Sequence, residues 1–269
     1  MFAALAERAV YYETHGDGFP LLLLNGIMMS TKSWTPFIEV LSARHRLILI
    51  DFLDQGQSDK MEAPYDHGIQ VDAIFAVLDD LGIESADIAG ISYGGQVALQ
   101  AALRQPERIR RLVIANAGLS TSAWLAEIGH GWNNVAGDGR AYYYASIPSI
   151  YSPGFYESRK DWMEARRAKL IPLFSDPVFA AQLVRLTDSS ESYDISAEAD
   201  SITQPTLIIG SETDCLTPLM EQKKLQAKLP NSELVIIPDC GHASMYEKPA
   251  LFASLVLGHL AHDQREFAI

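Results

Sequence analysis

A serine, an aspartate and a histidine stand where the sequence could assemble a nucleophile with its base. Ser92 lies in the run Gly90-Ile91-Ser92-Tyr93-Gly94, and Asp214 and His242 each follow a later apolar run. A serine hydroxyl is a weak nucleophile at neutral pH, so it needs a neighbouring base that a third group orients. These residue types, in this chain order, predict nucleophilic attack on an acyl carbonyl.

The glycines that flank Ser92 indicate how its hydroxyl is presented. The strand candidate Ala86–Ile91 precedes the serine, and the helical pattern Gly94–Arg104 follows it. A nucleophile on a sharp strand-to-helix turn needs small residues two positions before and after it, because side chains there would collide across the turn. A bare Gly-x-Ser-x-Gly pattern is common by chance, but with this strand and this helix it predicts a nucleophile elbow.

The acid and the base of the site are chosen from several candidates. Of the seven histidines, only His242 follows a late apolar run and a glycine. Asp214 is the favoured carboxylate, because Thr217, which precedes a proline, can cap the next helix and leave the aspartate free. Glu212 and Asp239 stay open as alternatives for the group that orients the histidine.

A tetrahedral intermediate also needs two backbone N–H groups that point at its oxyanion. The residue after the nucleophile, Tyr93, supplies the first. The loop Leu24–Ser30, which follows the first long apolar run, predicts the second at Ile27, directly after Gly26. An ordinary turn is the alternative interpretation of that glycine.

Apolar runs alternate with segments of helical period, a pattern that predicts an α/β fold with a mainly parallel sheet covered on both faces. The expected strands are Pro20–Asn25, Leu47–Asp51, Ala86–Ile91, Leu112–Asn116, Thr206–Gly210 and Leu234–Pro238. The expected helices are Trp34–Ser42, Gln70–Leu81, Gly94–Arg104, Pro218–Leu229 and Pro249–His262. A hairpin around Ala9–Glu13, with its turn at His15-Gly16-Asp17-Gly18, is expected to precede the first parallel strand.

This alternation breaks between Leu119 and Ser201, where aromatic residues are frequent and no buried strand is indicated. We expect a helical cap at 119–201, inserted into a core made of 1–118 and 202–269. Helical pattern and proline breaks predict several short helices, at Ala123–Ile128, Glu157–Leu170 and Pro177–Thr187. Most of the aromatic residues are expected to form a small helical core, and Leu119, Trp124 and Trp132 to line an apolar groove above Ser92 for medium acyl chains.

Composition narrows the function classes. The chain has 269 residues and a net charge of −13, which disfavours nucleic acid as a partner. No apolar run approaches the roughly 20 residues that span a bilayer, and no basic segment precedes the first apolar stretch, so we expect a cytoplasmic protein. Cys215 and Cys240 are too few for a disulfide framework and are expected to be free thiols. No metal or nucleotide motif occurs, so no cofactor is expected.

Taken together, these motifs resemble the α/β-hydrolase family over essentially the full length of the chain. The resemblance rests on the Gly26 turn, on Asp51 with Gly56-Gln57-Ser58, on Gly90–Gly95, and on Gly241-His242. It implies a mainly parallel central sheet flanked by helices, with a helical cap. Two positions depart from the commonest members.

The departures are Asn25, where histidine is usual, and Asp54, where glycine is common. The run Asn25-Gly26-x-Met28 is similar to hydroxyacyl transferases that make rhamnolipid and polyhydroxyalkanoate precursors from carrier-protein thioesters. That similarity implies that Asn25 and Met28 contact an acyl substrate, which could be carried on CoA or a carrier protein. Tyr93, where that subgroup has tryptophan, and the run Cys215–Pro218 instead resemble generic esterases.

The sequence therefore predicts a serine hydrolase that cleaves small acyl esters or thioesters through Ser92, His242 and Asp214. A hydroxyacyl transferase is the second hypothesis. A non-catalytic small-molecule binder on the same fold is the third, because function belongs to the site and not to the fold. The complete set of three side chains argues against the binder.

Overall fold

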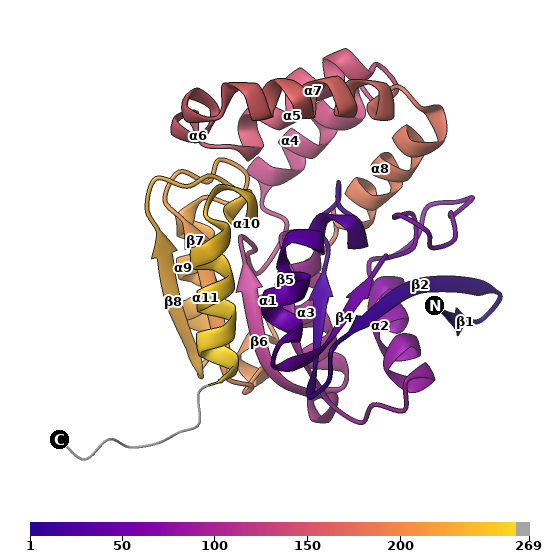
Figure 1. Ribbon diagram of the computed structural model, residues 1–269, viewed down its shortest axis with the longest axis vertical. Helices are drawn as coiled ribbons and strands as arrows, with labels where there is room; N and C mark the ends of the chain where they lie inside the picture. Colours follow the sequence, from indigo (N-terminus) through magenta and orange to yellow (C-terminus); the bar gives the residue numbers. More distant parts are fainter. Residues whose placement is uncertain (262–269) are drawn as a thin grey trace.

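The computed structural model describes residues 1–261, and an eight-stranded sheet forms its centre (Figure 1). The strand order is β1-β2-β4-β3-β5-β6-β7-β8; the first two pairings, β1 with β2 and β2 with β4, are antiparallel and all later ones are parallel. The strands are β1 (Phe2–Leu5), β2 (Arg8–His15), β3 (Phe19–Leu24), β4 (His45–Ile50), β5 (Ala86–Ile91), β6 (Ile109–Ala115), β7 (Thr206–Ser211) and β8 (Ser232–Ile237). This sheet confirms the predicted fold class.

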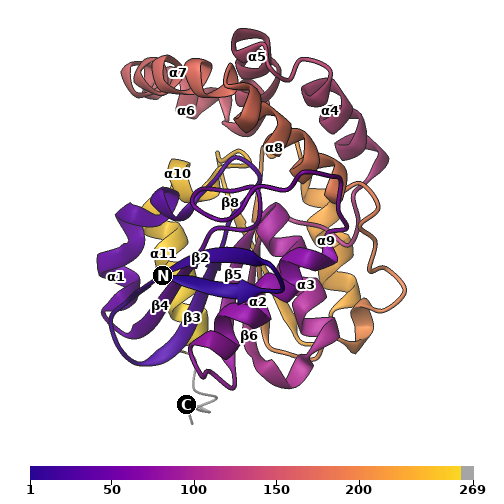
Figure 2. The ribbon, with the colours of Figure 1, turned by 90° about the vertical axis from the view of Figure 1, so that its right-hand side faces the viewer.

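Helices cover both faces of the sheet, as Figure 2 shows. One face carries α1 (Ile38–Ser42) and α11 (Pro249–Leu260), and the other carries α2 (Gly68–Asp80), α3 (Tyr93–Arg104) and α9 (Leu219–Lys228). Shorter elements are η1 (Thr31–Phe37), η2 (Pro106–Arg108), η3 (Ala199–Ser201) and α10 (Ser244–Glu247).

The near-continuous apolar strands are explained by this double cover. Successive residues of a strand point to opposite faces, and in β3 Leu21 and Leu23 pack in one hydrophobic cluster while Leu22 and Leu24 pack in the other. Both faces of the strand are therefore dry, which is why the sequence shows an apolar run and not an alternating pattern.

The prediction that the first hairpin joins β2 to the first parallel strand, β3, was wrong. The hairpin lies one connection earlier, between β1 and β2, and closes at Leu5 and Arg8. The segment His15–Gly18 does connect β2 to β3, but β2 pairs with β4. The reason is that both edges of β3 are already occupied by parallel neighbours, β4 and β5.

A layer of five helices lies above the carboxyl ends of the strands (Figures 1 and 2). They are α4 (Ala123–Asn133), α5 (Gly139–Ile150), α6 (Pro153–Ser158), α7 (Lys160–Phe174) and α8 (Pro177–Ser189). Four of them begin at a side chain that accepts a backbone N–H, as N-caps do: Ser122, Asp138, Ser152 and Asp176. The sequence did not indicate α5 and α6 as separate helices.

The aromatic residues of this layer mostly pack on one another, in a cluster that includes Trp132, Tyr142, Tyr143, Tyr151 and Phe174. The division of the chain at 119–201 stays a prediction. Tyr193 and Ile195, which lie inside that range, pack in the same cluster as the sheet.

Helix α11 ends at Leu260, and His262, the expected last residue of that helix, lies outside the described residues.

Across residues 1–261, the structure contains no helix with both the length and the apolar character needed to cross a bilayer.

Candidate active site

Ser92 stands at the tight turn between β5 and α3. Its φ of 54° and ψ of −119° are rare for a residue with a side chain, which is the strain that a nucleophile elbow stores. A Cβ on Gly90 would lie 2.3 Å from the carbonyl oxygen of Gly94, and one on Gly94 would lie 2.5 Å from that of Leu24. Gly90 therefore requires glycine for the expected reason, a collision across the turn, whereas Gly94 requires it because a side chain would collide with the end of β3.

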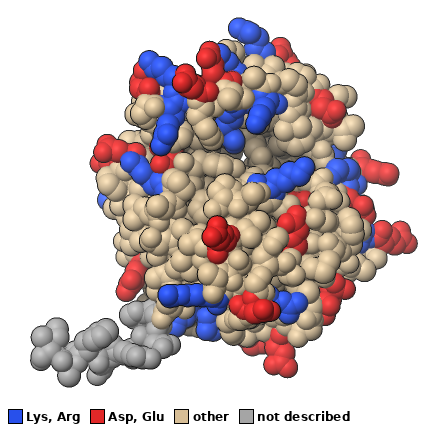
Figure 3. All heavy atoms as spheres, viewed as in Figure 1, with Lys and Arg blue, Asp and Glu red and all other residues tan. Residues whose placement is uncertain are grey.

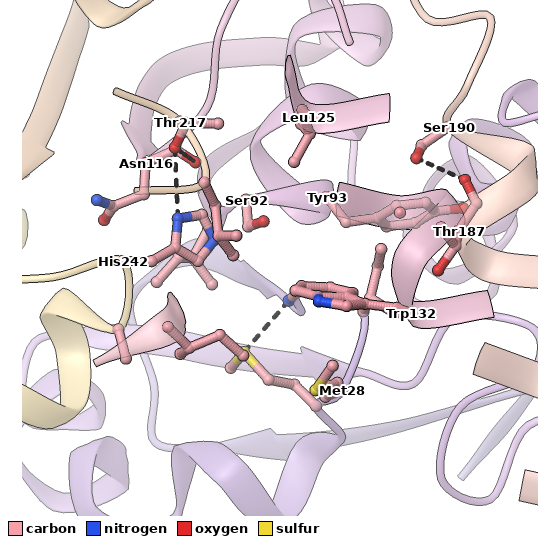
Figure 4. A pocket seen from close by; sticks show the side chains of 18 of the residues that line it. Met28, Ser92, Tyr93, Asn116, Leu125, Trp132, Thr187, Ser190, Thr217 and His242 are labelled. Carbon is pink, nitrogen blue, oxygen red and sulfur yellow. Dashed lines mark hydrogen bonds between the residues drawn. The ribbon is translucent and has the colours of Figure 1, made fainter. Parts of the chain in front are cut away.

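His242 and Asp214 meet at the carboxyl ends of β8 and β7. His242 Nδ1 lies 2.9 Å from Asp214 Oδ2 and 3.1 Å from Oδ1, and both side chains are buried. A proton on Nδ1 held by the carboxylate leaves Nε2 free to accept a proton from a hydroxyl. Ser92 and His242 line the same cavity, into which Figure 4 shows both side chains pointing.

The alternative carboxylates lie elsewhere. Glu212 and Asp239 are exposed, and Glu212 Oε2 accepts the backbone N–H of Asp239 at 2.9 Å. Asp214 is instead held by its own loop, because its Oδ1 accepts the backbone N–H groups of Leu216 and Thr217 at 2.9 and 3.0 Å. The structure thus brings Asp214, among the three candidates, to the histidine.

Two further side chains bond Asp214: Asn116, which was not singled out in the sequence, and Thr217, which was expected to cap the next helix. That helix, α9, has no side-chain cap at its N-terminus, and Thr217 bonds the aspartate instead. Asn116 Nδ2 and Thr217 Oγ1 donate to Asp214 Oδ2 at 2.9 and 2.8 Å. Burial by itself would raise the pKa of the Asp214 carboxyl, but the His242 ring and these donors hold it below its usual value. A signal for Asn116 was available, because it directly follows β6 at the edge of the sheet where such folds place their sites.

The two expected oxyanion donors belong to the elbow itself and to the loop that follows β3. Tyr93 is the first residue of α3, so its N–H has no acceptor within the helix. The loop with Ile27 contacts the elbow, since a Cβ on Gly26 would lie 3.6 Å from Ser92 Cβ. Ile27 and Tyr93 both line the cavity.

The carbonyl oxygen of the peptide between Gly26 and Ile27 accepts two donors, the side-chain amide of Gln55 and, at 3.2 Å, the backbone N–H of Met29. Gln55 Nε2 donates to the carbonyl oxygens of Gly26 and Ile27 at 2.8 and 3.2 Å. Because a trans peptide is planar, its N–H points opposite to its carbonyl oxygen. Holding the Gly26 oxygen at Gln55 therefore directs the Ile27 N–H away from Gln55.

Of the expected substrate contacts, Met28 and Trp132 line the cavity (Figure 4), and Asn25, Leu119 and Trp124 do not. Asn25 is fully buried behind the loop, where it bonds the Trp34 indole, the Ile50 carbonyl and Gln55.

Leu119 and Trp124 were also expected to line the cavity, and packing explains why neither does. Leu119 is buried in the hydrophobic cluster of the sheet, and its carbonyl accepts the N–H of Ile195 at 2.9 Å. Trp124 is 58% exposed, because its indole N–H donates to the carbonyl oxygen of Cys215 at 2.6 Å and its ring stays on the surface.

The cavity lies between the helical layer and the strand ends and offers about 130 Å³ of space. That is close to the roughly 150 Å³ of an apolar protein cavity that binds benzene. Its lining is mainly apolar, and the guanidinium of Arg166 lies at its wall over the rings of Trp162 and Tyr246. In Figure 3, basic and acidic side chains are interspersed toward the top of the view, where α7 runs. This helix carries Lys160, Arg166, Arg167 and Lys169 together with Asp161 and Glu164.

Comparison with known proteins places this geometry in a family. The model of the α/β hydrolase fold family matches residues 20–249. The chain belongs to the α/β-hydrolase fold family. It is 49% identical to MGS-M2, an alpha/beta hydrolase enzyme from a Medee basin deep-sea metagenome library, with a TM-score of 0.98 and all of both chains covered.

Two curated relatives are also hydrolases. The chain is 32% identical to a 2-hydroxymuconate semialdehyde hydrolase of Pseudomonas sp. strain CF600, over 91% of this chain and 88% of the relative. It is 28% identical to a pimeloyl-(acyl-carrier protein) methyl ester esterase of Nitrosomonas europaea, over 91% and 97%. These relatives support hydrolase activity for the chain.

Proposed function

We propose that this α/β hydrolase is a serine hydrolase of acyl esters or thioesters. The observation that carries the proposal is the buried Asp214–His242 pair, with 2.9 Å between Oδ2 and Nδ1, beside the Ser92 elbow. Ser92 Oγ attacks the acyl carbonyl while His242 takes its proton, and His242 then returns the proton to the leaving group. Water hydrolyses the acyl-enzyme in the same way, and Asp214 orients the ring throughout.

The backbone N–H groups of Ile27 and Tyr93 hold the oxyanion in this scheme. Each donor acts where negative charge develops, and removing one such donor typically costs about 10²- to 10³-fold in rate. The apolar lining and the size of the cavity favour a small to medium acyl group, since each buried methylene adds roughly 0.8 kcal/mol until the space is filled.

The carrier of the acyl group is a second part of the proposal. On α7, Lys160 and Arg167 pair with Glu157 and Glu164, so recognition of a charged carrier depends on Arg166 at the cavity wall and on Lys169. These two charges favour a leaving group with phosphates or an acidic carrier, such as a CoA or carrier-protein thioester. We expect an acyl-CoA to react faster than the matching neutral N-acetylcysteamine thioester, with the advantage shrinking as salt screens the charges. Equal rates at low salt would remove the carrier from the proposal.

Transfer to a hydroxyacyl or CoA acceptor ranks behind hydrolysis. The sequence argument for transfer depended on the run Asn25-Gly26-x-Met28; Met28 lines the cavity, but Asn25 is buried behind the loop and outside the cavity. A transferase would release its acyl group quickly only when an acceptor is added. For the hydrolase, we expect the ratio of free acid to transfer product to change little when an acceptor is added.

The deciding experiment is labelling with a fluorophosphonate probe, followed by mass spectrometry and by rates on p-nitrophenyl esters of two to twelve carbons. We expect a label on Ser92 alone, no turnover in Ser92→Ala, and kcat/KM that rises over several carbons and then levels. A label on another residue, or an active and folded Ser92→Ala, would refute the mechanism. A flat chain-length profile would refute the apolar groove.

A further inference from the structure

Two consecutive residues, Asp54 and Gln55, hold two different parts of the molecule. The Asp54 carboxylate accepts both prongs of the Arg185 guanidinium, Nε to Oδ2 at 2.9 Å and Nη2 to Oδ1 at 2.7 Å. Arg185 belongs to α8 in the helical layer. Gln55 holds the carbonyls of Gly26 and Ile27 beside the nucleophile. One short loop thus joins the helical layer to the expected oxyanion donor.

The ion pair gives a structural reason for the aspartate at this position, where the resemblance to α/β-hydrolases implied glycine. Asp54 has a φ of 69°, a left-handed conformation that is unfavourable for a residue with a side chain. Its side chain offsets this by accepting the N–H of Met61 at 2.9 Å and by pairing with Arg185. The Asp54 side chain is fully buried and that of Arg185 is 17% exposed, so neither charge has a good alternative partner in water.

Gln55 cannot turn without breaking other bonds. Its Oε1 accepts from Asn25 Nδ2 at 3.0 Å and from the backbone N–H of Phe52 at 3.3 Å. Asn25 is fixed in turn, because its Oδ1 accepts the indole N–H of Trp34 at 2.7 Å. Every one of these side chains is buried. The amide N–H groups of Gln55 therefore have one direction open to them, toward the loop carbonyls.

We infer that Gln55 is a positioning residue for the Ile27 N–H. We also infer that the Asp54–Arg185 ion pair makes the alignment of this N–H depend on how the helical layer packs against the loop. The inference rests on the proposed oxyanion role of Ile27. When α8 is docked, Arg185 holds Asp54 and thereby the adjacent Gln55. When α8 moves away, the loop at 51–58 loses its bidentate partner and the donor loses its alignment.

The first test replaces Gln55 by glutamate. Gln55→Glu keeps the size of the side chain and the acceptor for Asn25, but it turns the donor into an oxygen that faces two carbonyl oxygens. We expect kcat on a short p-nitrophenyl ester to fall about 10- to 100-fold while KM changes less than threefold. The affinity for butylboronic acid, which forms a tetrahedral adduct with Ser92, should fall by a similar factor.

The matched control is Gln57→Glu, the same change on the exposed side of the same loop, with kcat and boronate affinity expected to stay near wild type. Wild-type kcat and boronate affinity in Gln55→Glu would overturn the inference, and so would a loss in kcat without a loss in boronate affinity. Fluorophosphonate labelling of Ser92 in the wild type separates this failure from failure of the proposed function, because labelling and turnover would persist.

The second test addresses the coupling to α8. Arg185→Met leaves Asp54 buried without a partner, and the double variant Arg185→Met with Asp54→Gly removes the stranded charge and the strain. We expect kcat and boronate affinity to fall about tenfold in both the single and the double variant, because both lack the ion pair between the loop and α8. Recovery of wild-type values in the double variant would show that only the stranded charge mattered, and would overturn the coupling.

Discussion

The proposed acid–base groups and the proposed oxyanion donors around Ser92, called here the acid–base side and the oxyanion side, are built in different ways. On the acid–base side, the carboxylate of Asp214 takes two of its donors from Leu216 and Thr217, two and three residues further along the chain. On the proposed oxyanion side, the Gly26 carbonyl accepts the N–H of Met29 in its own loop and is also held by Gln55, which is 29 residues away. The direction of this peptide therefore depends on a side chain from a separate segment as well as on its own loop.

The two sides also differ in charge. The acid–base side buries a carboxylate against a histidine, while the loop on the oxyanion side is supported from behind by the neutral amides of Asn25 and Gln55. The Asp54–Arg185 ion pair joins the neighbouring segment to α8. Substitutions on the charged side should therefore lower the rate of proton transfer directly. Substitutions on the neutral side should lower the rate by misaligning the oxyanion donor.

The largest effect is expected from Asp214→Asn. An amide at this position keeps the shape but cannot hold the histidine proton in the required tautomer, and a loss of about 10⁴-fold in kcat follows. Glu212→Gln and Asp239→Asn are the controls and should stay within a few-fold of wild type, since both residues are exposed. An equal loss in either control, measured as kcat/KM on the same ester, would move the acid to that residue.

A smaller effect is expected from Trp34→Phe on the oxyanion side. The change strands the buried Oδ1 of Asn25, which costs about 1–3 kcal/mol of unfolding free energy and loosens Gln55. We expect kcat to fall several-fold with little change in KM. Phe37→Leu, in the same hydrophobic cluster, should lower stability without lowering kcat. Matching kcat losses in the two variants would mean that packing alone is responsible.

The unfolding free energy should decline in two different pH ranges, one governed by His67 and the other by Asp214. Burial lowers the pKa of His67, whose ring contacts Tyr93 at 4.4 Å, to about 4 despite the nearby Asp66. The unfolded chain binds a proton at His67 below about pH 6.5 and the folded chain does not, so unfolding free energy falls by up to about 3 kcal/mol toward pH 4. The lowered pKa of Asp214 stabilises the fold above about pH 4, and that contribution disappears on further acidification.

Urea unfolding at stepped pH measures both ranges. His67→Phe should remove the decline between about pH 6.5 and 4, because an apolar ring there binds no proton. Asp214→Asn should leave that decline and flatten the one below about pH 4. A decline above pH 4 that survives in His67→Phe would assign it to other groups.

The smallest effect concerns the two cysteines beside the acid–base pair. Cys215 is exposed, whereas Cys240 is buried and its pKa is raised by burial to about 11. At pH 8 iodoacetamide should modify Cys215 alone and leave the esterase rate within twofold, because Asp214 is held by backbone groups and not by the thiol. Modification of Cys240, or a large loss of rate on modifying Cys215, would contradict this description of the loop.

What could be predicted from the sequence was local in origin. The glycine at Gly90 follows from the space at one turn, and the apolar runs follow from strands that are covered on both faces. The positions of Asp214 and His242 after successive strands follow from the rule that parallel strands end at one edge of a sheet. These inferences need only a few neighbouring residues and the general geometry of a parallel sheet.

What only the tertiary structure decided depends on contacts between distant segments. The sequence alone determined which side chains could react, but not that Asn25 supports the loop from behind, that Gln55 orients a peptide, or that Arg185 reaches Asp54 across 131 positions. Each of these is a polar side chain whose role is set by what lies within about 3 Å of it after packing. Local patterns carry no record of such neighbours, because the same amide or guanidinium fits many partners equally well until the fold selects one.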